Sequence, residues 1–239
     1  INPKIVESIE YLSSQILIVG GGISGLFAAS ILANAGLKII LLERDFIFGG
    51  FSNSSDQKLK NWIKKLTSDL YKSKNCTILK NTTFIYTDAD NNFFALRKIY
   101  KNNKNNFLTQ SSILLKIVAE HVIIATGLKE RTLPNINLNQ SNVFLASKIY
   151  QLIHRFGLKA LNNVVIYTNN DFGWDTAFNL LNLGIEIKAI IDTRKDCNIS
   201  INCPVFRGAQ IVKIHGSSNI KSIKILDKNH TSHSIKTSS

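Results

Sequence analysis

The stretch from Ile16 to Leu37 has no charged side chain and carries three consecutive glycines at positions 20–22. Its length would suffice for a membrane-spanning helix, but the glycines would interrupt such a span. The pattern instead predicts a buried strand at 16–19, a helix over 23–35 and a second buried strand at 38–42. These three elements form a βαβ unit, which implies a parallel sheet.

The turn inside this unit, Gly20-Gly21-Gly22-Ile23-Ser24-Gly25, fits the pattern G-x-G-x-x-G. Gly20 permits the tight turn, Gly22 lets the backbone approach a pyrophosphate, and Gly25 lets the helix pack against the sheet. The amides that open the helix would then face the phosphates. Glu43 ends the next strand, where a carboxylate accepts hydrogen bonds from ribose hydroxyls and repels a 2′-phosphate. FAD or NAD is therefore favoured over NADP.

Two further glycine-bearing segments are predicted to pass close to the dinucleotide. Gly49-Gly50 follows the ribose-binding acid, and Ala125-Thr126-Gly127 ends a fully apolar strand at 122–125. Glycine at such strand ends permits close approach of a ligand. Gly50, Thr126 and Gly127 are therefore candidate cofactor-binding residues.

The order of elements predicts an α/β fold with a doubly wound parallel sheet, of the two-domain type found in flavin and nicotinamide enzymes. An amphipathic helix over 59–70 follows the first βαβ unit. Strands near 93–99 and 107–118 predict a small antiparallel hairpin insert at about 88–118. We expect a dinucleotide-binding domain at 10–150 and a second, Rossmann-like domain at 151–230. The last dozen residues are polar, and we expect them to be loose.

The second domain contains another βαβ pattern at 164–192, but its turn reads Thr168-Asn169-Asn170-Asp171. Asp171 is predicted to cap the helix with its carboxylate, and that charge disfavours a phosphate. We therefore expect no second pyrophosphate site. Glu130-Arg131 is more typical of a loop-bracing ion pair than of an acid–base pair. No catalytic residue stands out.

Composition excludes several classes of protein. The net charge is +13, yet no aromatic-and-arginine platform of the kind that binds RNA accompanies it, so we expect no nucleic-acid partner. Three cysteines without a CxxC pair and five scattered histidines predict neither a disulfide framework nor a metal site. A reducing cytoplasm and no membrane association fit these features. The absence of methionine indicates an internal piece of a longer polypeptide.

Three segments, "IIATGLKERTLPN", "NVFLASKIYQLIHRFGL" and "VVIYTNNDFGWDTAFNLLNLGIEIKAIIDTR", together resemble the α subunit of heterotetrameric sarcosine oxidase. The segment "NTTFIYTDADNNFFALRK" agrees as well, and the resemblance covers residues 10 to 226. It implies a flavoprotein disulfide reductase-like fold that holds NAD non-covalently, with FAD as the alternative. By position it implies cofactor contacts at Ser24, Glu43, Arg44, Asp45, Phe51 and Phe84. Phe51 stands where that family tends to have a small hydroxyl residue.

The resemblance also implies partners. In that family, sarcosine is oxidised in a β subunit carrying FAD, with FMN near the subunit boundary, and smaller subunits complete the hetero-oligomer. The products are glycine, hydrogen peroxide and a one-carbon unit. The chain would lack a closing strand and a folate-binding region, which would leave its nucleotide site incomplete. The alternatives are a related amine or amino-acid oxidoreductase (an opine oxidase, a hydrogen cyanide synthase or a dye-linked proline dehydrogenase) and a scaffold subunit with a structural dinucleotide.

Overall fold

The computed structural model describes residues 6, 8–50, 57–102, 108–133, 142–157, 161–216 and 219–237. By its internal contacts the chain divides into two compact units, Ile1–Leu128 and Lys129–Ser239. The sequence-based ranges, 10–150 and 151–230, place the boundary later along the chain. That the two units are functional domains stays a proposal.

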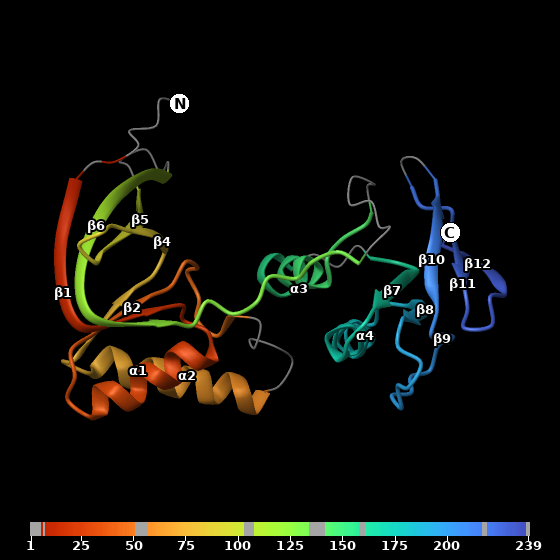
Figure 1. Ribbon diagram of the computed structural model, residues 1–239, viewed down its shortest axis with the longest axis horizontal. Helices are drawn as coiled ribbons and strands as arrows, with labels where there is room; N and C mark the ends of the chain where they lie inside the picture. Colours follow the sequence, from red (N-terminus) through yellow and green to blue (C-terminus); the bar gives the residue numbers. More distant parts are fainter. Residues whose placement is uncertain are drawn as a thin grey trace. The chain divides into compact units, whose positions relative to one another are not determined.

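The first unit is built on one six-stranded sheet in the order β3-β2-β1-β6-β5-β4 (Figure 1). Its parallel half contains β1 (Ser8–Val19), β2 (Ile39–Leu42), β3 (Cys76–Leu79) and β6 (Leu108–Ile124). Its antiparallel half adds β5 (Asn92–Asn102) and β4 (Thr82–Thr87) to β6. The predicted α/β class with a parallel sheet is confirmed.

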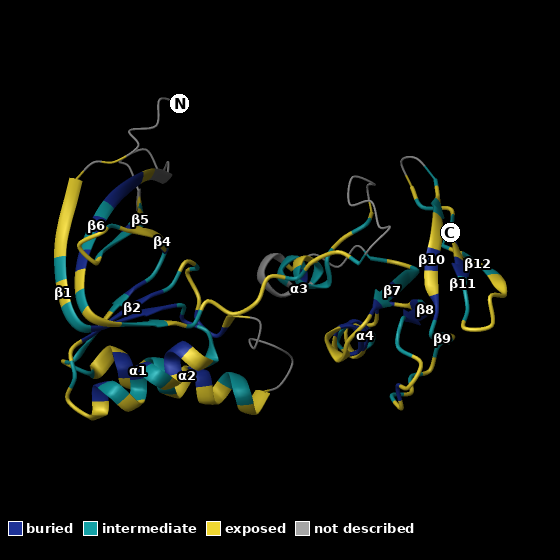
Figure 2. Cartoon of the chain, viewed as in Figure 1, coloured by how far each residue is buried: buried dark blue, intermediate teal, exposed yellow. Residues whose placement is uncertain are grey.

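Helices α1 (Ile23–Asn34) and α2 (Gln57–Lys72) cover one face of the parallel strands (Figure 2). Alternation along β1 explains the two-sided core, because Ile16 and Ile18 pack towards the helices while Leu17 and Val19 face away. The second cluster also takes in Leu115 and other residues of β5 and β6. Residues 16–19 of β1 and the whole of β2 are therefore buried on both faces, as the sequence pattern predicts.

The hairpin differs from the predicted insert. The strands expected at 107–118 and 122–125 are one strand, β6, which pairs with β5 along one edge and with β1 along the other. Ala119 and His121 keep the register with Ser14 and Ile16, and no glycine or proline interrupts them. The hairpin is consequently part of the main sheet rather than a separate element.

The second unit has a parallel sheet of β7 (Val164–Thr168), β8 (Ile187–Asp192) and β9 (Val205–Arg207), in that order. Helices α3 (Ala146–Phe156) and α4 (Asp171–Asn182) share a core cluster with β7 and β8, in which Trp174 is fully buried. A separate cluster joins β8 to an antiparallel sheet of β10 (Gln210–His215), β11 (Ser222–Leu226) and β12 (Ser232–Lys236).

The expectation that the last dozen residues are loose is wrong for Ser232–Lys236. This segment is polar, but it pairs with β11 along its length, from Ser222↔Lys236 to Leu226↔Ser232. Backbone pairing with a buried neighbour stabilises a polar edge strand that the residue types alone do not indicate. In the described part of the chain, no helix is long and apolar enough to cross a membrane.

Candidate dinucleotide-binding site

The site begins where β1 ends, at Gly20. This residue has a positive φ of +112°, and a Cβ there would lie 2.3 Å from the carbonyl oxygen of Ala125. Its amide donates to the carbonyl of Leu42 at 2.8 Å. A residue with a side chain could satisfy neither the dihedral angle nor the contact, so glycine is required at this turn.

Gly25 holds α1 against the same turn. A Cβ on Gly25 would lie 1.8 Å from the carbonyl oxygen of Gly20, a distance that no side chain could occupy. The predicted role of this glycine in close helix–sheet packing therefore agrees with the geometry. The close contact keeps the first turn of α1 at the carboxyl end of β1.

Gly22 lies between these two contacts in a different environment. It precedes α1 with extended dihedral angles (φ −71°, ψ −175°), and no side chain caps the helix. A Cβ built on Gly22 meets no atom within 4 Å. The space in front of this residue is open, and the first turn of α1, with Ser24 exposed on it, lies beside that space. Uncapped amides next to open space suit an anionic ligand.

Glu43 braces the glycine turn. One carboxylate oxygen accepts a hydrogen bond from the amide of Gly21 and the other accepts from the amide of Asp45, each at 2.7 Å. Burial raises the pKa of the Glu43 carboxyl above its ordinary value, although the two amides act in the opposite direction. The sequence predicts a ribose-binding acid here. The structure adds the bond to Gly21, which pattern reasoning missed because the two residues are distant in sequence.

The glycine pair at 49–50 returns to the turn. The Gly49 amide donates to the carbonyl of Gly21 at 2.9 Å, and Gly49 forms a parallel bridge with Gly22. A Cβ on Gly50 would lie 3.7 Å from the Gly22 Cα. Both Gly49 and Gly50 have positive φ, which explains the two glycines. The segment that the sequence predicts to pass close to the dinucleotide therefore passes close to the glycine turn at Gly21 and Gly22.

Phe48 is a further supporting residue that sequence reasoning missed. Its ring is buried, and a Cβ on Gly21 would lie 2.5 Å from it. The ammonium group of Lys80 lies 4.8 Å from the centroid of the same ring. Gly21 occupies a variable position of the motif, and the packing of the Phe48 ring explains why this position is also a glycine.

The remaining candidates lie around this core to different degrees. Arg44 is exposed and Asp45 half-buried, directly after Glu43. Thr126 and Gly127 follow Ala125, whose amide donates to the carbonyl of Val19 at 2.8 Å. Gly127 has a positive φ of +74°. Together they place polar backbone and side chains at the same strand ends as the glycine turn.

Phe84 and Phe51 differ from the rest. Phe84 is half-buried on β4, where it packs against the core cluster of Leu17 and Leu42, with its ring centroid 6.4 Å from that of Phe93. Its role at an adenine edge stays a prediction. Phe51 lies outside the described residues.

The corresponding turn of the second unit is capped by a different residue from the one predicted. The side-chain oxygen of Asn170 accepts from the amide of Phe172 at 3.1 Å, so Asn170 is the N-cap of α4. The expectation that Asp171 caps the helix is wrong, because Asp171 lies in the first turn and pairs with Arg194 at 2.8 Å. Asparagine is an equally good cap, and its position one residue earlier leaves the acid free to turn outwards.

One glycine of the motif persists in this second turn. A Cβ on Gly173 would lie 2.3 Å from the hydroxyl oxygen of Thr168. Gly173 is therefore the counterpart of Gly25, while Thr168 and Asn170 replace the first two glycines of the pattern. Architecture is retained here, and a side chain occupies the capping position that Gly22 leaves open in the first unit.

Asp192 ends β8 at the position that corresponds to Glu43, and it is fully buried. It accepts hydrogen bonds from the indole of Trp174 at 2.7 Å and from the guanidinium of Arg194 at 2.8 Å. Burial alone would raise the pKa of Asp192, but these bonds outweigh it and hold the pKa below its ordinary value. The carboxylate is thus fully engaged within the protein.

Glu130 caps α3, and the loop-bracing ion pair that the sequence predicts with Arg131 stays a prediction. Its two carboxylate oxygens accept from the amides of Ala146 at 3.2 Å and Ser147 at 2.7 Å. Over the ranges that the structure describes, no group of three or more histidine, cysteine or acidic residues could hold a metal ion.

A parallel sheet with a glycine turn at its first strand end, an acid on the second strand and a Rossmann-like second unit defines a dinucleotide-binding fold of the flavoprotein disulfide reductase class. A family model described as the Thi4 family matches residues 2–129. The chain belongs to the Thi4 family.

Curated relatives extend the likeness beyond this family segment. The chain is 28% identical over 227 residues to sarcosine oxidase subunit alpha of Rhizobium meliloti (strain 1021), and 24% identical over 211 residues to that of Corynebacterium sp. (strain U-96). These matches cover 90% and 84% of the chain. The chain spans about a fifth of the length of these relatives, 22% in each case. The resemblance to the sarcosine oxidase α subunit that the sequence indicates is confirmed.

Solved structures agree on the fold. L-proline dehydrogenase from P. horikoshii is similar with a TM-score of 0.65 and 17% identity, over 97% of this chain and 42% of that one. Lactococcus lactis thioredoxin reductase gives a TM-score of 0.63 and 15% identity, over 93% of this chain and 74% of that one. These neighbours are flavoprotein disulfide reductase-like folds, in agreement with the predicted fold class.

Proposed function

We propose that the first unit binds a dinucleotide with a free 2′-hydroxyl on its adenosine ribose, with FAD as the first candidate and NAD as the second. The observation that carries this proposal is the contrast among the three motif glycines. A Cβ added to Gly20 or Gly25 would lie only 2.3 Å or 1.8 Å from a backbone carbonyl oxygen, whereas Gly22 faces open space beside uncapped helix amides. A pyrophosphate needs a backbone without a side chain at that position.

We further propose roles for the surrounding candidates. Gly22 and Ser24 contact the pyrophosphate, Gly20 and Gly25 shape the turn that holds it, Glu43 contacts the ribose, and Arg44 and Asp45 flank it. Gly50 and Phe51 on one side, and Thr126 and Gly127 on the other, border the cofactor, with Phe84 at the adenine edge. Glu43 can serve both the loop and a ribose, because each carboxylate oxygen accepts more than one hydrogen bond.

For the whole protein, we propose an α-type subunit of a sarcosine oxidase-like oxidoreductase acting on CH–NH donors. Its complex would oxidatively demethylate sarcosine to glycine, a one-carbon unit and hydrogen peroxide. Catalysis would occur in a β subunit with FAD and FMN, alongside smaller subunits, in the cytoplasm. The relatives named sarcosine oxidase subunit alpha support this proposal.

A second candidate rests on the similarity to L-proline dehydrogenase, with a TM-score of 0.65. It is a related amine or amino-acid oxidoreductase subunit, of the opine oxidase, hydrogen cyanide synthase or dye-linked proline dehydrogenase type. The third candidate is a scaffold subunit, which would bind a structural dinucleotide at the same site. Turnover of the reconstituted complex with sarcosine and with proline distinguishes the first two.

The cofactor is tested by acid extraction of the purified full chain, followed by chromatography and mass spectrometry. We expect FAD, together with flavin absorbance of the intact protein. Recovery of NAD alone would select the second candidate. An extract without a dinucleotide, from a protein that also fails to bind added FAD and NAD, would contradict the proposal.

A further inference from the structure

Strand β1 extends well beyond its neighbour β2. It pairs with β6 from Ser8 to Val19, but with β2 only from Ile16 to Val19. Within the described ranges, no strand pairs with residues 8–14 on the β2 side (Figure 1). As far as the structure describes the chain, these seven residues of β1 form a free sheet edge.

This edge carries few of the features that usually protect one. Its sequence, SIEYLSS, has a single charged residue, Glu10, and neither lysine nor proline. The side chains of Ile9 and Tyr11 are 53% and 75% exposed. Exposed edges of this length normally carry lysine, proline or a bulge, because they otherwise pair with another chain. A weakly protected edge that exposes Ile9 and Tyr11 indicates an interaction site.

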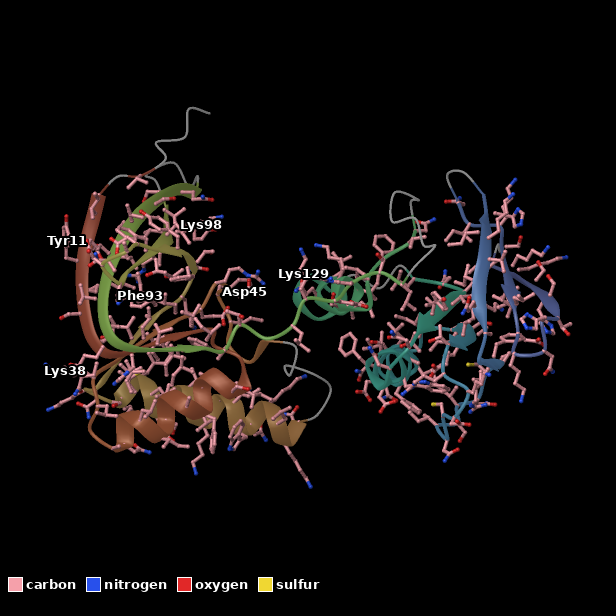
Figure 3. The ribbon with its side chains drawn as sticks, in the orientation of Figure 1. Tyr11, Lys38, Asp45, Phe93, Lys98 and Lys129 are labelled. Carbon is pink, nitrogen blue, oxygen red and sulfur yellow. The ribbon has the colours of Figure 1, made fainter. Side chains whose placement is uncertain are left out.

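Tyr11 is the last member of a row of side chains across the outer face of the sheet. The register places Tyr11 opposite Lys116, Lys116 opposite Phe94, and Phe94 opposite Tyr86. The rings of Phe94 and Tyr86 stack at 4.5 Å, and the Lys116 ammonium lies 5.9 Å from the Phe94 centroid. Figure 3 shows Tyr11 on the outer side of the curved sheet and Phe93 on its inner side. The row ends at the free edge.

The charge at this edge indicates the kind of partner. Lys38 is exposed and lies where β2 begins. Its backbone carbonyl accepts hydrogen bonds from the amides of Gln15 and Ile16. Lys116 is the cation of the row, whereas Glu10 lies on the opposite face, since neighbouring residues of a strand alternate. Two copies of a chain with net charge +13 would repel each other. An acidic partner is favoured over a second copy.

We propose that residues 8–14 of β1 dock an extended segment of an acidic partner polypeptide by strand addition. The segment continues the line of β2, pairs its backbone with β1, and extends the row beyond Tyr11 with β-branched or aromatic side chains. A carboxylate at its end lies near Lys38. Main-chain pairing supplies affinity and the alternating side chains supply selectivity. The site is separate from the glycine turn and does not depend on bound dinucleotide.

The test uses the full chain and fluorescently labelled synthetic peptides of alternating valine and threonine with glutamate at both ends. Fluorescence anisotropy should show saturable binding, together with slower amide hydrogen exchange in residues 8–14. The same peptide N-methylated at alternate residues should lose binding, since it cannot pair its backbone. Equal binding of the methylated peptide, or protection elsewhere in the sheet, would overturn the proposal.

Protein variants supply the matched controls. Tyr11→Lys should weaken peptide binding at least about tenfold, because it introduces an edge-protecting charge. Tyr100→Lys makes the same change at an exposed tyrosine of β5 that lies outside the row, and it should leave binding unchanged. Lys38→Glu should weaken the acidic peptide and favour a lysine-ended one. Equal effects of Tyr11→Lys and Tyr100→Lys would contradict the site, as would sedimentation showing that the chain dimerises through this edge.

Discussion

The carboxylate of Glu43 accepts a hydrogen bond from the amide of Gly21 at 2.7 Å. The end of β2 is thereby tied to the turn that follows β1, across 22 residues of sequence. A group expected to bind the ribose also fixes the loop in front of the pyrophosphate. Preorganisation of this kind lowers the entropic cost of binding.

Glu43 should couple nucleotide binding to pH. Burial raises its pKa above the ordinary value of 4.5, so the folded protein holds the proton of this carboxyl more strongly than the unfolded chain does. Its contribution to the free energy of unfolding is full below the unfolded pKa and is lost as pH rises through the folded pKa. Relative to Glu43→Gln, the wild type should therefore lose stability with rising pH across this window. Urea unfolding at a series of pH values checks this.

Dinucleotide affinity should show the opposite trend, because the ionised carboxylate is the better acceptor for ribose hydroxyls. The wild type should bind more tightly as pH rises through the raised pKa, while Glu43→Gln should bind weakly and without that dependence. If the dinucleotide affinities of the wild type and Glu43→Gln changed with pH to the same extent, Glu43 would not be a ribose-binding residue.

Gly25→Ala should destabilise the first unit by about 3 kcal/mol, an overpacking cost, because the new Cβ has no space beside the Gly20 carbonyl. Trp62 lies in this unit and Trp174 in the other, so each tryptophan reports on one unit. Fluorescence-monitored unfolding in a Trp174→Phe background should show the loss. Gly36→Ala tests another glycine of the first unit that has a positive φ but no contact within 4 Å, and it should cost less. Equal costs would show that the tight contact is unimportant.

Asn170→Ala should cost about 1 kcal/mol of stability in the second unit, which is typical for removing an N-cap. Asp171→Ala should cost clearly less, because its ion pair with Arg194 is exposed on the Asp171 side. Unfolding followed by Trp174 fluorescence in a Trp62→Phe background measures both. A larger loss for Asp171→Ala would restore the acid as the effective cap.

Asp192→Ala should destabilise the second unit by about 3 kcal/mol, since it leaves the Trp174 indole and Arg194 guanidinium without their acceptor. The lowered pKa of Asp192 means that its stabilisation is present above the unfolded pKa and is lost as pH falls through the folded pKa. Acid unfolding of Asp192→Asn should consequently be less steep than that of the wild type. Identical acid transitions would contradict this network.

The sequence allowed the glycine turn to be predicted because its constraints are local. A positive φ at Gly20 and a close contact at Gly25 each demand glycine, and the pattern records that demand directly. The acid at Glu43 was found for the same reason, by its spacing from the turn. Gly173 in the second turn corresponds to the third glycine of the motif. Sequence reasoning missed it because the other two motif positions are Thr168 and Asn170.

Long-range pairing could not be read in the same way. The continuity of β6 depends on β1 and β5 lying on either side of it, and the residue types of Ala119–His121 do not indicate this. The cap at Glu130 and the bonds of Asp192 join residues that come together only after folding. Polar β12 is a strand because β11 pairs with it.

The most direct test of the central claim is a titration of the full chain and its Gly22→Val variant with FAD, alongside thermal unfolding of both. Gly22 has a negative φ and open space around it, so valine should leave the unfolding temperature of the unliganded protein nearly unchanged. The same side chain should block the approach of the pyrophosphate and weaken FAD binding about a hundredfold or more. FAD affinity equal to that of the wild type, in a variant that folds normally, would contradict the account.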